Sequence, residues 1–285
     1  MRWKTRRRSE HVEDRRRMRV SRGALGGGLG TLVLVLVALY FGIDPTMLLE
    51  QTVPTSDSTY TDSMPPGGSP EQDELADFIS VVLADTEDTW NGLFNQMGKT
   101  YSVPKLVLFS GAVQSACGFA QAAVGPFYCP RDKKVYIDLS FYRDLRDRFK
   151  APGDFAQAYV IAHEVGHHVQ TLLGISSQVR TLQQRVSQRE ANRLSVKQEL
   201  QADCFSGVWA FHADRMRNLL EAGDIEEGLQ AASSIGDDRI QKQTRGYVIP
   251  ESFTHGTSSQ RVAWFKRGFS SGDLSNCNTF DVAGL

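Results

Sequence analysis

Five residues, His163-Glu164-Val165-Gly166-His167, constrain what this chain can fold into more than any other part of its sequence. Two histidines four residues apart lie on one face of an α-helix, so both imidazoles can reach a single Zn²⁺ at about 2.0–2.1 Å. Glu164 then points beside the metal, where it can take a proton from metal-bound water. Apolar neighbours predict a buried helix over residues 154–173, capped by Asp154. A surface helix with two unrelated histidines is the alternative.

A catalytic zinc normally takes three protein ligands and keeps one position open. The long metzincin pattern has glycine and histidine where this chain has Gln170 and Leu173, so the third ligand must come from elsewhere. We expect it to be Glu199, with Asp203 one turn further accepting a hydrogen bond from a ligand histidine. An exposed acidic helix face is the alternative. Weaker ligand candidates are Glu190, His212 and Asp214, and His168 is interpreted as a bystander.

The pattern of apolar residues predicts one α+β domain over residues 74–285, with helices in excess and a small sheet. The helical spacing of apolar residues between Leu75 and Met97 predicts a first helix. Short apolar runs rich in branched side chains predict strands. Strands are expected at 105–109 and 134–139, and further helices at about 177–193, from near 195 past 209, at 224–242 and at 257–269.

Residues 24–43 are predicted to form a transmembrane helix, because the twenty-one residues between Arg22 and Asp44 carry no charge. At 1.5 Å per residue, such a helix is about 30 Å long and can cross a bilayer. A cleavable signal peptide is the alternative, but Tyr40 and Phe41 stand where a signal peptidase needs small side chains. The negative mean hydropathy of −0.31 excludes a polytopic membrane protein.

Residues 1–23 hold ten Lys and Arg against three Asp and Glu, whereas the whole chain has a net charge of −1. Before a membrane span, this charge predicts an N-terminus in the cytoplasm and a domain outside it. A nucleic-acid arm and contacts with lipid headgroups are the alternatives, and we expect no nucleic-acid partner. Residues 44–73, rich in Ser, Thr, Pro and Gly, are predicted to be a flexible linker.

Four cysteines are compatible with two disulfides in an oxidising compartment. Cys117 and Cys129 flank a segment of eleven residues that is short enough to close readily. Cys204 then pairs with Cys277, tying the C-terminal tail to the helix that carries Glu199. Other pairings, and four reduced cysteines packed as small apolar residues, remain as alternatives.

Several segments together resemble the bacterial neutral zinc metallopeptidase family of membrane-anchored peptidases. They are residues 1–4 with the following basic residues, 125–130, 135–139, 163–168, 199–204, and 253–257 with Arg261. The resemblance covers nearly the whole chain apart from the linker, and it implies a gluzincin-type, zincin-like fold. It also implies that residues 135–139 form the edge strand that pairs with extended substrate, an ordinary core strand being the alternative. His255 and Arg261 become candidates for stabilising an oxyanion, or else cap a surface helix.

The motif and the resemblance predict a membrane-anchored, zinc-dependent endopeptidase that acts on a peptide or protein substrate. His163, His167 and Glu199 are the expected Zn²⁺ ligands, and Glu164 is the expected general base. One alternative is an inactive scaffold with the same fold and a structural zinc; the presence of Glu164 favours the enzyme. The other is a cytoplasmic nucleic-acid-binding protein in which residues 24–43 form a buried core helix.

Overall fold

The computed structural model describes residues 1–18 and 69–281. The predicted transmembrane helix at 24–43 and most of the predicted linker at 44–73 lie outside the described residues. No helix in the described part of the chain is both long enough and apolar enough to cross a membrane. Residues 1–18 and the described residues from 69 onward form one compact unit.

A four-stranded sheet has the order β1-β2-β6-β5, in which β5 runs antiparallel to β6 and the other neighbours are parallel. The strands are β1 (Val12–Asp14), β2 (Lys105–Phe109), β5 (Phe127–Cys129) and β6 (Lys134–Asp138). A separate hairpin joins β3 (Ala112–Ser115) to β4 (Gly118–Gln121).

The sequence of β2 is almost continuously apolar because both of its faces are covered. Leu106 and Leu108 belong to the main core together with the helices. Val107 and Phe109 point the other way, into a smaller core that includes Val113 of the hairpin. The alternation along one strand therefore builds two cores, one on each face of the sheet.

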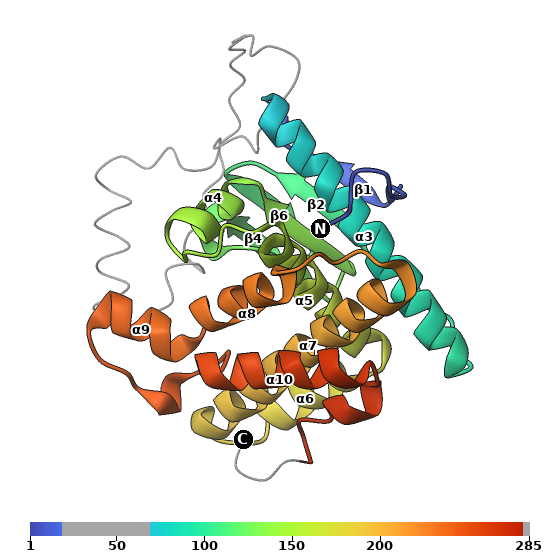
Figure 1. Cartoon of the computed structure of the whole chain (residues 1–285). Coiled ribbons are helices and arrows are strands. Elements are labelled where there is room, and N and C mark those ends of the chain that lie inside the picture. The colour runs from blue at the N-terminus through green and yellow to red at the C-terminus, as the bar shows by residue number, and fades with distance from the viewer. Residues whose placement is uncertain (19–68, 282–285) are drawn as a thin grey trace, which may run out of the picture. The chain divides into compact units, whose positions relative to one another are not determined.

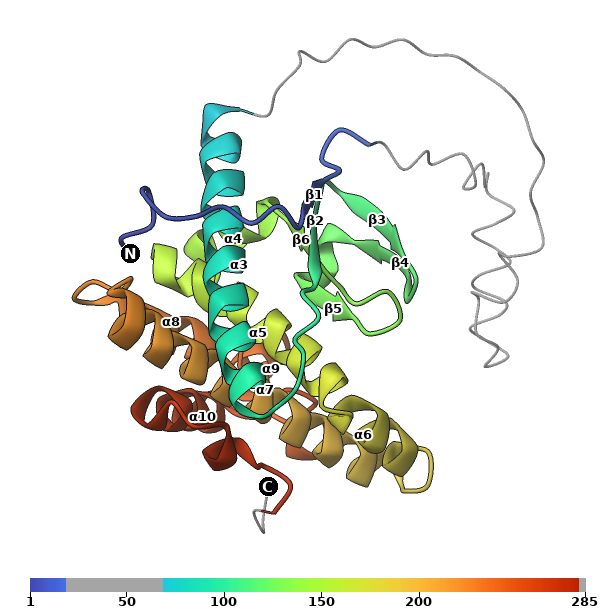
Figure 2. The same ribbon diagram turned by 90° about the vertical axis from the view of Figure 1, so that its right-hand side faces the viewer.

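Helices make up most of the remaining fold (Figure 1). They are α3 (Pro70–Gln96), α4 (Ser140–Asp147), α5 (Asp154–Leu172), α6 (Ile175–Gln183), α7 (Gln188–Arg217), α8 (Asp224–Ser234), α9 (Asp237–Arg245) and α10 (Ser258–Ser271). Single turns of 3₁₀ helix occur at η1 (Ala122–Val124), η2 (Pro250–Ser252) and η3 (Leu274–Cys277). Helix α5 contacts β5, β6 and α3 as well as α7, and α10 packs along α7 (Figure 2).

The crossing of α7 and α10 is close enough to require glycine. A Cβ at Gly268 would lie 2.0 Å from the backbone oxygen of Cys204. The two backbones can approach each other this far because the side chain is absent at that point. This close approach holds α10 against the part of α7 that carries the candidate metal ligand.

The predicted helix-rich α+β class is confirmed, and so are the helices at 75–97, 154–173 and 257–269 and both predicted strands, within a few residues. Two predicted helices are wrong. The helix expected at 177–193 is broken after Gln183, and Ser187 caps the new helix α7, which then continues through residue 195. The helix expected at 224–242 is broken at Gly236, where a Cβ would lie 2.4 Å from the backbone nitrogen of Ser258.

Asp154 does not cap α5 as predicted. The N-cap residue is Gly153, and Asp154 is the first helical residue, where its charge favours the positive end of the helix. Periodicity also missed α4 and β1, the hairpin and β5, because elements of eight residues or fewer carry few repeats of either period.

The N-terminal residues differ from the predicted division of the chain. Residues 1–18 were expected to be part of a separate basic segment, on the opposite side of a membrane from a domain starting at 74. Instead, β1 pairs with β2, Val12 facing Leu106, and the Trp3 ring packs edge-on against Phe78 at 5.3 Å. These contacts make residues 1–18 an integral part of the domain.

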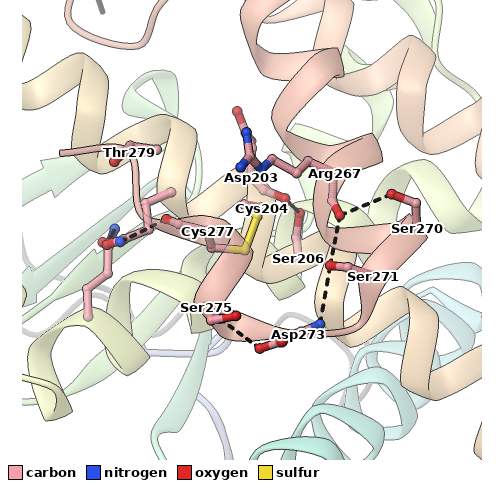
Figure 3. The surroundings of a disulfide bond; sticks show 12 residues. Asp203, Cys204, Ser206, Arg267, Ser270, Ser271, Asp273, Ser275, Cys277 and Thr279 are labelled. Carbon is pink, nitrogen blue, oxygen red and sulfur yellow. Dashed lines mark hydrogen bonds between the residues drawn. A yellow bond between two sulfur atoms is a disulfide. The ribbon is translucent and has the colours of Figure 1, made fainter. Parts of the chain in front are cut away.

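Both expected disulfides are present. Cys117 in the hairpin turn is bonded to Cys129 at the end of β5, and Cys204 of α7 is bonded to Cys277 of η3. Figure 3 shows the second bond directly beside Asp203. This disulfide ties the C-terminal segment to the middle of α7.

Candidate metal centre

Helix α5 presents its two motif histidines to α7 at a close crossing of the helices. A Cβ at Gly166 would lie 3.1 Å from the backbone oxygen of Ala202, which is tighter than an ordinary contact. The glycine between the histidines therefore lets α7 come close enough for Glu199 to reach them.

Two imidazoles and one carboxylate converge at this crossing. Nε2 of His163 lies 3.2 Å from one oxygen of Glu199, and Nε2 of His167 lies 3.3 Å from the other. The ligand atoms of the three residues all lie within 4.8 Å of one another. Ligands about 2.0–2.1 Å from a tetrahedral zinc are separated by about 3.3 Å, so this set fits Zn²⁺.

The other nitrogen of each imidazole is held by an acceptor. Nδ1 of His163 lies 2.9 Å from Asp203, and Nδ1 of His167 lies 2.9 Å from the side-chain oxygen of Gln170. Gln170 itself donates to the backbone oxygen of Gln198 at 2.7 Å, which fixes the orientation of its amide. With each Nδ1 donating, each Nε2 is left as a free acceptor for a cation.

Asp203 is the centre of a buried polar network. Arg261 donates to both of its oxygens at 2.9 Å, and the hydroxyl of Tyr159 donates to it as well. Asp203 is fully buried and Arg261 is 2% exposed. The guanidinium therefore compensates a carboxylate that would otherwise be a buried, unpaired charge.

The surroundings of the triad favour positive charge. Burial lowers the pKa of His163, but the Asp203 charge and hydrogen bond outweigh it and raise that pKa to about 10. Burial raises the pKa of Glu199, and the two histidines more than reverse this, so the pKa lies well below its usual value. A site that stabilises added positive charge so strongly suits a divalent cation.

Glu164 lines the same cavity as the triad, which has a volume of about 430 Å³. It is 8% exposed. No hydrogen bond or ion pair to its carboxylate is found among residues 1–18 and 69–281. A buried carboxylate without a protein partner, open to a cavity, is available to a ligand in that cavity.

His255 also lines the cavity. Its Nδ1 lies 3.2 Å from Asp237, which also accepts hydrogen bonds from the backbone N–H groups of residues 254–256. The hydrogen bond to Asp237 raises the pKa of His255. Asp237 thus holds both the loop and the ring of a half-exposed histidine.

The other sequence candidates lie elsewhere. Glu190 is exposed and pairs with Arg193, and His212 contacts the backbone oxygen of Gly272. Neither these two nor Asp214 joins the triad. His168 is buried between the Tyr128 hydroxyl and the backbone oxygen of Ser102, so it does not contribute to the triad.

Two expectations need revision. Residues 134–138 form an interior strand flanked by β2 and β5, so the edge strand beside the site is β5. Arg261, a candidate for stabilising an oxyanion or for capping a surface helix, does not cap a surface helix: it lines the cavity, is buried, and donates to Asp203.

Three residues of the site were missed by sequence reasoning: Tyr159, Gln170 and Asp237. Tyr159 lies one turn before His163, on the same helical face, which was a usable signal. Gln170 was noted only because it breaks a longer motif. Asp237 offered no signal, because its contact with His255 joins two separate elements.

Comparisons with known proteins agree with this geometry. Residues 1–280 match the family described as "Putative neutral zinc metallopeptidase". The chain is 56% identical to "Uncharacterized protein YpfJ" of Escherichia coli K12, over 98% of this chain and 99% of that one. It is 40% identical to "Uncharacterized protein Rv2575" of Mycobacterium tuberculosis H37Rv, over 87% of this chain and 86% of that one. No solved structure matches the chain.

Proposed function

The chain belongs to the neutral zinc metallopeptidase family, and from this we propose that it is a zinc-dependent endopeptidase with a gluzincin-type fold. One observation carries the proposal: the unpaired carboxylate of Glu164 shares a cavity with His163, His167 and Glu199. Peptide hydrolysis needs a base beside the metal ligands, and the presence of Glu164 in their cavity supports that role for it.

In this proposal His163, His167 and Glu199 hold the ion. When bound, Zn²⁺ supplies Lewis acidity, which lowers the pKa of water to about 7 and polarises a peptide carbonyl. Glu164 accepts a proton from the attacking water and returns it to the leaving amine.

Residues around the base and ligands orient the reaction. His255, held by Asp237, faces the cavity and can donate a hydrogen bond to the oxyanion that forms during attack. Asp203 and Gln170 fix the two imidazole rings. We assign Arg261 a positioning role through Asp203, since its donors are directed at that carboxylate and at Tyr159.

The alternative, an inactive scaffold with a structural zinc, predicts the same metal content without hydrolysis. Full-length protein is the proper sample, because residues 1–18 contribute a strand. It should contain about one zinc per chain and cleave an unfolded protein such as casein. Zinc-loaded protein that cleaves no peptide bond would favour the scaffold.

Attachment to a membrane through residues 24–43 is a separate proposal, supported by the twenty-one residues without charge. A location of the domain outside the cytoplasm is supported by its two disulfides. Alkaline extraction of membranes tests the attachment, because release into the soluble fraction contradicts it.

A further inference from the structure

A second pocket of about 240 Å³ adjoins the cavity beside the triad. Tyr128, His167 and Glu199 line both of them. Because the two pockets share these residues, they adjoin each other at the triad, and together we call them the groove. The edge strand β5 runs along it, with Phe127 in the first pocket and Tyr128 in both.

The two ends of the groove differ in chemistry. The wall of the first pocket is formed largely by apolar side chains, from Phe127, Phe141, Phe149, Ile235 and Ile240. The second pocket is polar and contains Arg180. Arg180 is exposed. Within the described part of the chain, its guanidinium makes no hydrogen bond or ion pair.

We propose that the groove selects extended peptides with a large apolar side chain on one side of the cleaved bond and an acidic side chain on the other. This inference rests on the proposed peptidase function. The apolar side chain is buried among the phenylalanines and isoleucines, and the carboxylate pairs with Arg180. The free edge of β5 can add the peptide backbone as a further strand.

The test uses four peptides that combine Phe or Ala on the apolar side with Glu or Lys on the other. Binding is measured by fluorescence anisotropy on full-length, zinc-loaded Glu164→Gln protein, and cleavage is measured on the wild type. We expect the Phe-to-Ala change to weaken binding tenfold or more, and the Glu-to-Lys change about fivefold.

Arg180→Glu should reverse the preference between Glu and Lys. Arg185→Glu is the matched control, because Arg185 is equally exposed nearby but does not line the groove. If wild type cleaves all four peptides equally, or if both variants behave alike, the selectivity is wrong while the peptidase function stands. If no peptide is bound or cleaved, both proposals fail.

Several basic residues near the N-terminus are paired within the fold. Three of these arginines pair with acids of α3: Arg7 with Glu87 at 3.0 Å, Arg8 with Asp77 at 2.6 Å, and Arg16 with Asp73 at 3.0 Å. Their charge is thus neutralised within the fold and is not reserved for lipid or nucleic acid.

The pairing of β1 with β2 is extended at both ends. The backbone N–H of Leu106 donates to the backbone oxygen of His11 at 2.9 Å, and the backbone N–H of Arg15 donates to the backbone oxygen of Leu108 at 2.7 Å. If residues 24–43 crossed a membrane once, residue 18 and residue 69 would lie on opposite sides, and this strand could not pair. We propose that residues 1–18 and 69–281 lie on the same side of the membrane.

Single cysteines at two exposed sites test this topology in the full chain: Thr5→Cys in the N-terminal arm and Gln184→Cys after α6. A membrane-impermeant maleimide is applied to cells before and after permeabilisation. We expect both sites to react under the same condition. Labelling of one site only after permeabilisation, and of the other before it, would overturn the inference. A second pair at exposed positions, Lys4→Cys and Arg245→Cys, repeats the test in case a variant of the first pair misfolds.

If both cysteines react under the same condition, that condition also tells on which side of the membrane the domain lies. Labelling of both sites without permeabilisation supports the same-side inference and the location outside the cytoplasm. Labelling of both only after permeabilisation supports the inference and contradicts that location.

Discussion

Nδ1 of His163 lies 2.9 Å from a carboxylate oxygen of Asp203, and the two side chains come from helices that cross at Gly166. This hydrogen bond orients the imidazole and leaves its Nε2 facing Glu199. Sequence spacing placed the two histidines on one helix and the two acidic residues, Glu199 and Asp203, on another. The structure joins the four side chains into one network.

Asp203→Asn should lower the affinity for zinc by 10- to 100-fold, roughly the effect of losing a partner that orients a ligand histidine. Competition with a chromogenic chelator measures this affinity. Glu190→Gln, at an exposed position on the same helix, is the control and should bind zinc like the wild type. Equal affinities in the two variants would show that Asp203 does not orient a ligand.

Arg261→Met should lower the free energy of unfolding by about 3–5 kcal/mol, because it leaves Asp203 buried without a positive partner. Urea denaturation measures the loss. Arg193→Met removes an exposed arginine that pairs with Glu190, and it should cost no more than about 1 kcal/mol. Similar losses in both variants would argue against a compensating role for Arg261.

The three expected metal ligands and Asp203 could be predicted because they form two pairs, each four residues apart on one helix. Helix geometry places His163 with His167, and Glu199 with Asp203, whatever surrounds them. Gln170 and Arg261 could not be assigned their contacts in this way. Gln170 acts through an amide whose orientation is set by α7, and Arg261 reaches Asp203 across 58 positions of sequence.

The contacts of the N-terminal residues with the domain could not be predicted, for a related reason. Local charge alone made the arginines a membrane signal, because their acidic partners on α3 are 57 to 81 positions away. Strand β1 has three residues, Val12–Asp14, and two of them are acidic. Such a strand shows no alternation to detect and forms because β2 offers it an edge.

His168 predicts a loss of stability in acid. Burial lowers its pKa to about 4 in the folded protein, against 6.5 for an ordinary histidine. A depressed histidine pKa means that the unfolded chain binds the proton more readily, so stability is complete above pH 6.5 and falls as the pH drops toward 4. The difference corresponds to at most about 3 kcal/mol.

Urea denaturation between pH 7 and pH 4 measures this dependence. His168→Gln removes the titrating group, so its unfolding free energy should fall less over that range than that of the wild type. Parallel curves for the two proteins would show that His168 is not responsible.

The two disulfides should differ in their contribution to stability. The entropy of loop closure predicts about 4 kcal/mol for Cys204–Cys277, which are 73 positions apart, and about 3 kcal/mol for Cys117–Cys129, which are 12 apart. Paired alanine substitutions, compared by urea denaturation under oxidising conditions, test the order. A larger loss for the shorter loop would contradict the loop-closure account.

The central claim is that Glu164 is the base of a zinc peptidase, and Glu164→Gln in the full-length protein tests it most directly. Zinc content and hydrolysis of an unfolded protein are measured on the same preparation of variant and wild type. The account predicts about one zinc per chain in both, and a loss of hydrolysis of at least about 100-fold in the variant. Wild-type hydrolysis by zinc-loaded Glu164→Gln protein would contradict it.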